Sequence, residues 1–311
     1  MISCPNCGGD TLSAHKQEIR LSAVLRGWEE GMGITFPQTV WEGYAHLLEE
    51  PIRLHSCRVC RLEVFLPIVV GTHEFYQAIT PREDSYYVSE KWEFNRAIKA
   101  IKKRAPGSVL DIGCGGGAFL SQLAQVKGVS AFGLEFNESA AAWARSKGHR
   151  LLDRLSREQA PVGGFDVVTL FQILEHLEAP FQVVKQVKEV MKPGGLMIVT
   201  VPDAGGPVRH FSDALTDLPP HHVTRWHERT VRVCAQRQRL TVLEIATEPL
   251  PYYVWDYYLP VILERDLLPS FVGKVLNRAG ITSCFLRILR RLGVRHLRPL
   301  RGHTLYAAFE V

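Results

Sequence analysis

The sequence lacks any apolar run that approaches the roughly 18 residues a membrane-spanning helix needs. Its N-terminus also lacks a basic segment followed by an apolar one, so we expect no signal peptide and a cytoplasmic protein. No internal repeat or low-complexity tract is present. The 311 residues, of which 46% are hydrophobic and 22% charged, predict an ordinary globular chain with one large and one smaller domain.

Acidic residues are missing from one long segment. No Asp or Glu occurs between Leu267 and Phe309, although eight basic residues do: Lys274, Arg278, Arg287, Arg290, Arg291, Arg295, Arg298 and Arg301. Residues 285–300 predict a basic amphipathic helix, with Phe285, Ile288, Leu289 and Leu292 on one face and Arg287, Arg290 and Arg291 on the other. Two interpretations stay open. The helix could cover the sheet and expose a solvated basic face. Alternatively, it could make peripheral contact with anionic lipid, or with a lipid-linked molecule on which the protein acts, at the inner membrane surface.

Cysteine is scarce, and four of the seven residues form two Cys-x-x-Cys pairs, Cys4 with Cys7 and Cys57 with Cys60. In a cytoplasmic protein such pairs indicate a metal site rather than a disulfide. Two pairs predict a four-sulfur structural zinc site in a small ribbon. The 49 residues between the pairs exceed the usual ribbon spacer, so we expect an insertion there and a hairpin around the second pair.

Residues 108–117, SVLDIGCGGG, organise the rest of the chain. The apolar run predicts a buried strand, and the glycines predict a tight turn into a helix that begins near Ala118. Glycine lets a backbone approach a ligand closely, because it has no Cβ and adopts positive φ. Asp111 precedes the turn, and Glu135 ends the next strand, where it is placed to accept two ribose hydroxyls. This order indicates a nucleoside site.

The glycines alone do not name the nucleoside. Gly113, Gly115 and Ala118 fit the G-x-G-x-x-G/A fingerprint, so a nicotinamide dinucleotide is an alternative. Two later stretches argue against it: FDVVTLFQILEHL at 165–177 and MKPGG at 191–195. Together with VLDIGCGGG, they resemble the motifs of Rossmann-like S-adenosylmethionine-dependent methyltransferases. The chain is similar over nearly its whole length to bacterial methyltransferases that carry an N-terminal zinc ribbon.

The resemblance implies an α/β fold: a Rossmann-like sheet of seven strands, mostly parallel with the last strand antiparallel, and a small N-terminal zinc ribbon. We expect the ribbon in residues 1–70, a linker and a helix over the cofactor site in 71–107, and the methyltransferase domain in 108–311. An aromatic and basic insertion is expected at about 250–302. Strands after the second are expected at 151–153, 165–171, 196–201, 241–246 and 304–309.

The resemblance also implies which residues contact S-adenosylmethionine. They are Tyr87, Asp111, Gly113, Cys114, Gly115, Gly117, Glu135, Phe136, Asp153, Phe171 and Gln172. Asp153 matches a position that often contacts the adenine amino group in this superfamily. Either Tyr86 or Tyr87 would lend an aromatic ring to the cofactor, with core packing as the alternative for both.

The implied reaction is methyl transfer to a small-molecule or carrier-linked acceptor, such as a sugar, a secondary metabolite or a cell-envelope intermediate, with O-methylation favoured. Nucleic acid is not an expected partner, because the ribbon lacks an interleaved basic and aromatic surface. Residues 165–177 also resemble quinone-biosynthesis O-methyltransferases, in which an acid three residues before Glu-His helps bind a divalent ion. Gln172 replaces that acid here, which argues against a metal at Glu175 and His176. An inactive methyltransferase-like scaffold is the alternative function.

A hydroxyl acceptor needs a base, and histidine suits that role near neutral pH. Three candidates follow the fourth and fifth expected strands: His176, and then His221 and His222 in a loop. We favour His176, followed by His221. Structural roles are the alternatives: His176 would cap the next helix or pack beneath the cofactor, and a loop histidine would face solvent.

Overall fold

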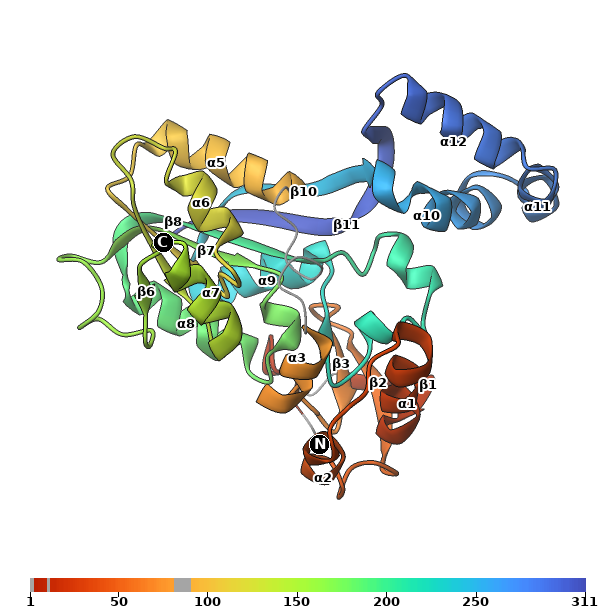
Figure 1. The fold of residues 1–311 in the computed structure, drawn as a ribbon, viewed down its shortest axis with the longest axis horizontal. Coiled ribbons are helices and arrows are strands. Elements are labelled where there is room, and N and C mark those ends of the chain that lie inside the picture. The colour runs from red at the N-terminus through yellow and green to blue at the C-terminus, as the bar shows by residue number, and fades with distance from the viewer. Residues whose placement is uncertain (1–2, 10–11, 81–90) are drawn as a thin grey trace.

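A computed structural model describes residues 3–9, 12–80 and 91–311. Its larger sheet has seven strands in the order β10-β11-β8-β7-β4-β5-β6, and only β11 runs antiparallel to its neighbours (Figure 1). The strands are β4 (Ser108–Ile112), β5 (Ser130–Leu134), β6 (Leu151–Leu152), β7 (Phe165–Phe171), β8 (Met191–Pro202), β10 (Thr241–Pro251) and β11 (His296–Glu310). The predicted Rossmann-like sheet is therefore confirmed.

Helices cover both faces of this sheet, which is why its central strands are apolar on both sides. On one face pack α5 (Trp92–Arg104) and α6 (Ala118–Leu123), and on the other α8 (Pro180–Glu189) and α9 (Glu228–Gln238). Val167 belongs to the first core and Val168 to the second, as the alternation of a strand requires. The helix α7 (Glu138–Ser146) joins β5 to β6, and its N-cap is Asn137, whose side chain accepts a hydrogen bond from the Ala140 amide.

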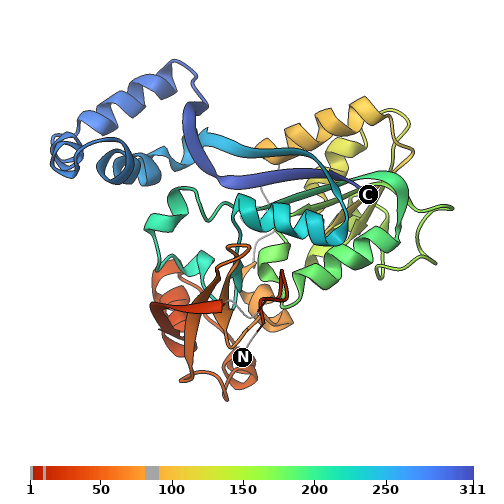
Figure 2. The same cartoon turned by 180° about the vertical axis from the view of Figure 1, so that it is seen from behind.

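The N-terminal region forms a second sheet in the order β1-β2-β3-β9 (Figure 2). Its elements are β1 (Leu12–Arg20), α1 (Leu21–Met32), α2 (Gln38–Gly43), β2 (Pro51–Cys57), β3 (Glu63–Leu66) and, after the sheet's first three strands, α3 (His73–Ile79). The expected hairpin around the second cysteine pair is β2 with β3. The fourth strand, β9 (Thr224–Arg225), comes from the C-terminal half, in a stretch that the sequence predicts as loop.

Short 3-10 helices fill the segments after β7 and β8: Leu174–His176, Pro207–His210 and Leu215–Asp217. The strand β8 begins at Met191 rather than at the expected Leu196, and β6 has only two residues. The domain boundary expected at residue 70 stays a prediction. The N-terminal sheet includes β9, a strand from the C-terminal half of the chain.

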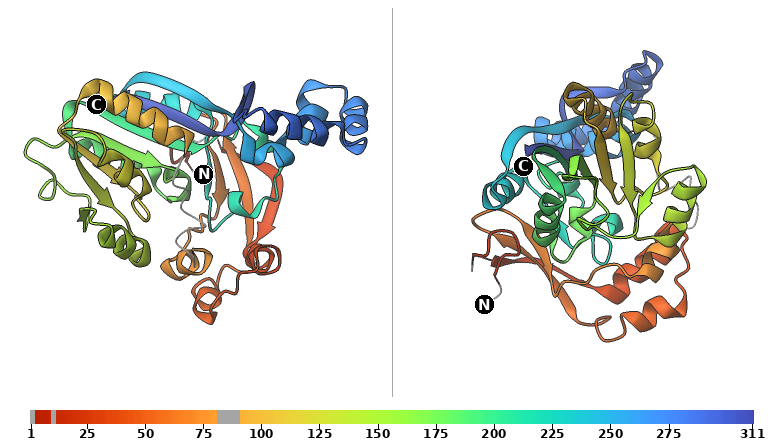
Figure 3. Two further views of the ribbon diagram at one scale, coloured as in Figure 1. Left: turned by 45° about the horizontal axis from the view of Figure 1, so that its top comes forward. Right: turned by 90° about the vertical axis from the view of Figure 1, so that its left-hand side faces the viewer.

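The strands β10 and β11 run beyond the sheet as a two-stranded ribbon that carries three helices (Figure 3). These are α10 (Trp255–Ile262), α11 (Ser270–Arg278) and α12 (Ile281–Arg291); a 3-10 turn at Tyr252–Val254 precedes α10 and a π-helical turn at Leu263–Leu267 follows it. The expected helix over 285–300 is wrong in its bounds. It starts earlier, at Ile281, and stops at Arg291 because Gly293 adopts a left-handed φ of 73°.

Candidate functional site

The glycine turn joins β4 to α6 at the carboxyl edge of the sheet. Gly113 and Gly117 have φ values of 71° and 79°, a region that disfavours other residues. A Cβ on Gly113 would lie 2.1 Å from Cδ1 of Ile173, and one on Gly117 would lie 2.4 Å from Cδ2 of His149. The chain therefore needs glycine at both positions to make this turn, as the motif predicts.

Two acids flank the turn. Asp111, on β4, is buried and accepts a hydrogen bond from Thr169, with 2.7 Å between Oγ1 and Oδ1. Glu135 follows β5, and its Oε2 accepts a hydrogen bond from the Gly115 amide at 2.7 Å. Burial raises the pKa of Asp111 to about 7 and also raises the pKa of Glu135. The structure thus brings both predicted acids and the glycine turn together.

The predicted cofactor residues beside the turn and after β7 differ in how exposed they are. Cys114 is buried within the turn, and Phe136, next to Glu135, is largely exposed. Gln172 follows β7 with a positive φ of 56°, and its backbone amide donates to the Thr200 carbonyl at 2.9 Å. Tyr87, like Tyr86, lies outside the described residues.

Of the two remaining predicted contacts, Phe171 is packed among aromatic rings and Asp153 is exposed. The Phe171 ring packs in the core, with its centroid 4.9 Å from that of Phe94 and 4.8 Å from that of Phe119. Asp153 follows β6 as an exposed side chain, 3.8 Å from an Arg145 guanidinium nitrogen. A hollow of about 440 Å³ lies beside Asp153. Neither the glycine turn nor Glu135 is among the residues that line it.

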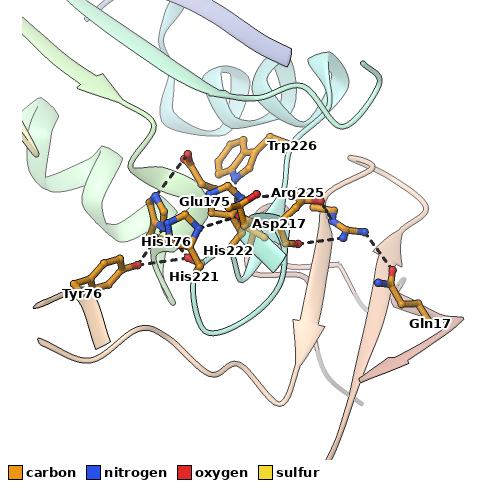
Figure 4. Close-up of polar contacts among 11 residues, drawn as sticks. Gln17, Tyr76, Glu175, His176, Asp217, His221, His222, Arg225 and Trp226 are labelled. Carbon is orange, nitrogen blue, oxygen red and sulfur yellow. Dashed lines mark hydrogen bonds and ion pairs between the residues drawn. The ribbon is translucent and has the colours of Figure 1, made fainter. Parts of the chain in front are cut away.

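The three predicted histidines meet in one cluster, although His176 and the pair His221 and His222 are 45 residues apart in sequence (Figure 4). The ring centroid of His176 lies 4.7 Å from each of the other two, and those two stack 4.5 Å apart. One ring nitrogen from each histidine lies within 4.8 Å of the others, so the cluster could also hold a metal ion. Among the described residues His176 does not cap the next helix, because the N-cap of α8 is Ala179, and no side chain caps this helix.

Each ring in the cluster has an oxygen next to its Nδ1. This oxygen is the His221 carbonyl for His176, at 2.6 Å, and the Thr216 carbonyl for His221, at 2.9 Å. For His222 it is the Asp217 carboxylate, at 3.3 Å. Since carbonyl and carboxylate oxygens accept hydrogen bonds, these contacts favour a proton on Nδ1 and a lone pair on Nε2.

Burial lowers the pKa of all three histidines, that of His176 to about 4, so the rings are neutral at pH 7. Burial raises the pKa of Asp217 to about 6, although Arg225, with its Nε 2.7 Å from Oδ2, opposes that shift. Asp217 is therefore mostly ionised at neutral pH. His222 is the cluster member that faces a carboxylate through Nδ1.

Several residues of this cluster were not predicted as functional. The Tyr76 hydroxyl lies 3.1 Å from Nδ1 of His176, and Asp217 and Arg225 support His222 (Figure 4). Glu175 is fully buried with its pKa raised to about 8 by burial, and in the described part of the chain neither carboxyl oxygen has a hydrogen-bond partner. No spacing in the sequence connects Tyr76 with His176, which follows 100 residues later.

The four paired cysteines converge as predicted. Sγ of Cys4 lies 3.6 Å from that of Cys60, Sγ of Cys7 lies 3.4 Å from that of Cys57, and all four residues are buried. A tetrahedral zinc with Zn–S bonds of about 2.3 Å places its sulfurs roughly 3.8 Å apart, so these spacings fit one ion. The contact between Cys4 and Cys60 lowers the pKa of the Cys4 thiol and raises that of Cys60, and burial raises the pKa of Cys7. Thiolates are the form that binds zinc.

The cysteine cluster is attached to helix α9, which packs on the seven-stranded sheet. The Asn6 side-chain amide donates to the Thr230 carbonyl at 3.1 Å, and the Thr230 hydroxyl donates to the Cys60 carbonyl at 3.0 Å. His227 and Glu63 make a further contact of 2.9 Å. The cluster is therefore packed against the sheet's helical layer, not held on a separate lobe.

A sequence profile of the methyltransferase domain family matches residues 86–245, which is 160 of the 311 residues. The chain belongs to the methyltransferase domain family. The matched range contains the glycine turn, the acids Asp111 and Glu135, and the three histidines of the cluster. The resemblance inferred from the sequence motifs, to class I S-adenosylmethionine-dependent methyltransferases, is thereby confirmed.

Individual relatives match a shorter stretch. The ubiquinone biosynthesis O-methyltransferase of Pseudomonas aeruginosa is 33% identical over 128 residues, which are 39% of this chain and 53% of that protein. The protein of the same name from Thiobacillus denitrificans is 36% identical over 113 residues, 34% of this chain and 46% of that protein. The chain thus matches about half the length of these curated relatives.

Matches to solved structures have low sequence identity. The match to a SAM-dependent methyltransferase from Archaeoglobus fulgidus covers 70% of this chain and 91% of that one, with 19% identity and a TM-score of 0.48.

In the described residues, no helix is both long and apolar enough to cross a bilayer.

Proposed function

We propose that this chain transfers the methyl group of S-adenosylmethionine to a hydroxyl oxygen of a small-molecule or carrier-linked acceptor. The observation that carries the proposal is the joining of the glycine turn to Glu135 beside the buried Asp111. Family membership supports the methyl transfer. The names of the relatives, ubiquinone biosynthesis O-methyltransferases, favour oxygen as the accepting atom.

The cofactor would lie along the carboxyl edge of β4, β5 and β6. Glu135 keeps lone pairs beyond its backbone bonds, since an ionised carboxylate has about four acceptor sites, and these would accept the ribose hydroxyls. Phe136 offers an exposed aromatic face to the adenine ring, and Asp153 is the candidate for the adenine amino group. Phe171 is left out of this set because its ring is packed between other aromatic rings.

His222 is the base that the geometry favours, in place of His176, which the sequence favours. As the acceptor oxygen attacks the methyl carbon, the carbon–sulfur bond breaks and S-adenosylhomocysteine leaves. The hydroxyl proton passes to Nε2 of His222, and the Asp217 carboxylate stabilises the imidazolium that forms. His176 and His221 have backbone carbonyls as their Nδ1 partners and would instead position the loop.

The cysteine cluster fits structural zinc. Cys4, Cys7, Cys57 and Cys60 would hold one ion, and bound zinc supplies folding free energy to the ribbon. The ion would tie the first residues of the chain to the hairpin of β2 and β3, and through Thr230 to α9.

The proposal is tested by incubating the purified protein with S-adenosylmethionine labelled in the methyl group and a bacterial metabolite extract. The expected product carries the label in a methyl ether, identified by mass spectrometry. Label in an N-methyl or C-methyl product would overturn the choice of oxygen. Tight cofactor binding without any labelled product would favour the inactive scaffold.

A further inference from the structure

The helices α10, α11 and α12 stand apart from the large sheet, at the far end of the β10–β11 ribbon (Figures 1 and 2). A small core of their own holds them together: Leu250, Trp255, Leu259, Ile262 and Leu286. The ribbon extends past the point where β8 ends at Pro202, which pairs with Thr304. The helical unit therefore lies beyond the carboxyl edge of the sheet, on the side of the proposed active site.

Two of these helices expose large apolar side chains away from that core. The residues are Phe271 (71% exposed) and Val275 (60%) on α11, and Ile281 (52%), Phe285 (52%), Ile288 (51%) and Leu292 (73%) on and just after α12. We call this set the outer surface. Within each helix its members follow one another at spacings of three or four residues, which place them on one face of that helix. A helix that packs only on its own protein normally buries such a face.

Unpaired positive charge borders the outer surface. Five exposed arginines have no acid within ion-pair distance in the described part of the chain: Arg278, Arg287, Arg291, Arg295 and Arg298. Arg290 and Arg301 differ, since they pair with Asp256 at 2.7 Å and Asp203 at 2.8 Å. In α12, Arg287 and Arg291 lie next to the apolar stripe, on the side away from the buried Leu286.

We propose that the outer surface docks on an anionic lipid bilayer. The apolar side chains would enter the boundary between headgroups and acyl chains, and the arginines would bind lipid phosphates. With 9 and 11 residues, α11 and α12 are shorter than the roughly 17–25 residues of a spanning helix, so they would lie in the membrane interface.

Charge excludes the simplest competing partners. A symmetric contact with a second copy would bring the same arginines face to face, with no acid between Leu267 and Phe309 to compensate. A nucleic acid would satisfy the arginines but leave the six apolar side chains in water. An anionic bilayer accommodates both features at once.

Flotation with lipid vesicles tests the proposal on the full chain. Vesicles containing phosphatidylglycerol should carry the protein upward at low ionic strength, whereas pure phosphatidylcholine vesicles should leave most of it behind. Replacing Phe285 and Ile288 together by Ser should abolish binding. The pair Arg287→Gln and Arg291→Gln should weaken it by about fivefold per arginine. Arg154→Gln with Arg157→Gln, exposed arginines on the loop after β6, is the matched control and should bind as the wild type does.

The remaining outcomes overturn the proposal. These are absence of flotation with anionic vesicles, equal binding to neutral vesicles, and an arginine pair that behaves as its control does. A dimer in sedimentation equilibrium that the Phe285→Ser, Ile288→Ser variant dissociates would assign the surface to a second copy. Unchanged circular dichroism and S-adenosylhomocysteine binding would show that each variant is folded.

Discussion

Oε2 of Glu135 accepts a hydrogen bond from the backbone amide of Gly115 across 2.7 Å. The acid that follows β5 therefore holds the glycine turn that follows β4. Its second oxygen accepts from the Asn137 amide at 2.8 Å, at the start of α7. One carboxylate thus fixes the two loops that would enclose the ribose, which makes it the most informative residue to change.

Replacing Glu135 with Ala should weaken S-adenosylhomocysteine binding by about 1–3 kcal/mol, or roughly 5- to 150-fold, because the Gly115 amide and the ribose hydroxyls lose their acceptor. Isothermal titration calorimetry measures the loss. The control is Glu138→Gln, an exposed acid in the first turn of α7, which should bind as the wild type does. Equal affinity in the Glu135 and Glu138 variants would remove Glu135 from the site.

Asp111 should make the fold less stable as pH rises. Its pKa is raised to about 7, well above the usual 3.8, so the favourable protonated form is present at low pH and is lost as pH rises through 7. Asp111→Asn removes that dependence. We expect the variant to exceed the wild type in free energy of unfolding by about 1–3 kcal/mol at pH 8, and by less at pH 5. Urea unfolding at both values checks this, and a difference that does not grow with pH contradicts it.

Cys57→Ser should lose the zinc and loosen the N-terminal sheet, while cofactor binding stays largely intact. Elemental analysis of protein purified without chelator should find one zinc per wild-type chain and close to none in the variant. Cys284→Ser, at an exposed cysteine on α12, is the control and should keep the metal. A wild-type stoichiometry near zero would reject the site.

Methyl transfer should fall as pH drops through about 6, because Asp217 then gains a proton and no longer stabilises the His222 imidazolium. His222→Asn should lower turnover by about 10²–10⁴-fold with normal cofactor binding. Asp217→Asn should also be slow and should lack the acid-side decline. His46→Asn, at an exposed histidine, is the control. Full turnover in the His222 variant would return the role to His176 or His221.

Local signals in the sequence identify much of the fold. The apolar run of β7 and the glycine turn each depend on neighbouring residues, so pattern alone predicts them. The two cysteine pairs also meet as predicted, because two Cys-x-x-Cys pairs are typical of the ligands of one metal ion. The end of α12 was missed because Gly293 outweighs the apolar spacing that continues to Leu292.

Long-range contacts could not be predicted in this way. The strand β9 has two residues, and only its partners on β3 make it a strand. The contact of Tyr76 with His176, 100 residues away, depends on how the N-terminal region packs. The contact of Asp217 with His222 is local, but it depends on the fold of the short loop that joins them. Sequence therefore identified the three histidines, but it gave no sign of the carboxylate that lies beside Nδ1 of His222.

The identity of the cofactor is the central claim, and titration calorimetry on the wild-type chain tests it most directly. We predict that S-adenosylmethionine and S-adenosylhomocysteine each bind one site per chain with a Kd in the micromolar range, about −8 kcal/mol. NADH should give no heat of binding at the same concentrations. Binding of NADH, or the absence of binding by both S-adenosyl compounds, would contradict the account.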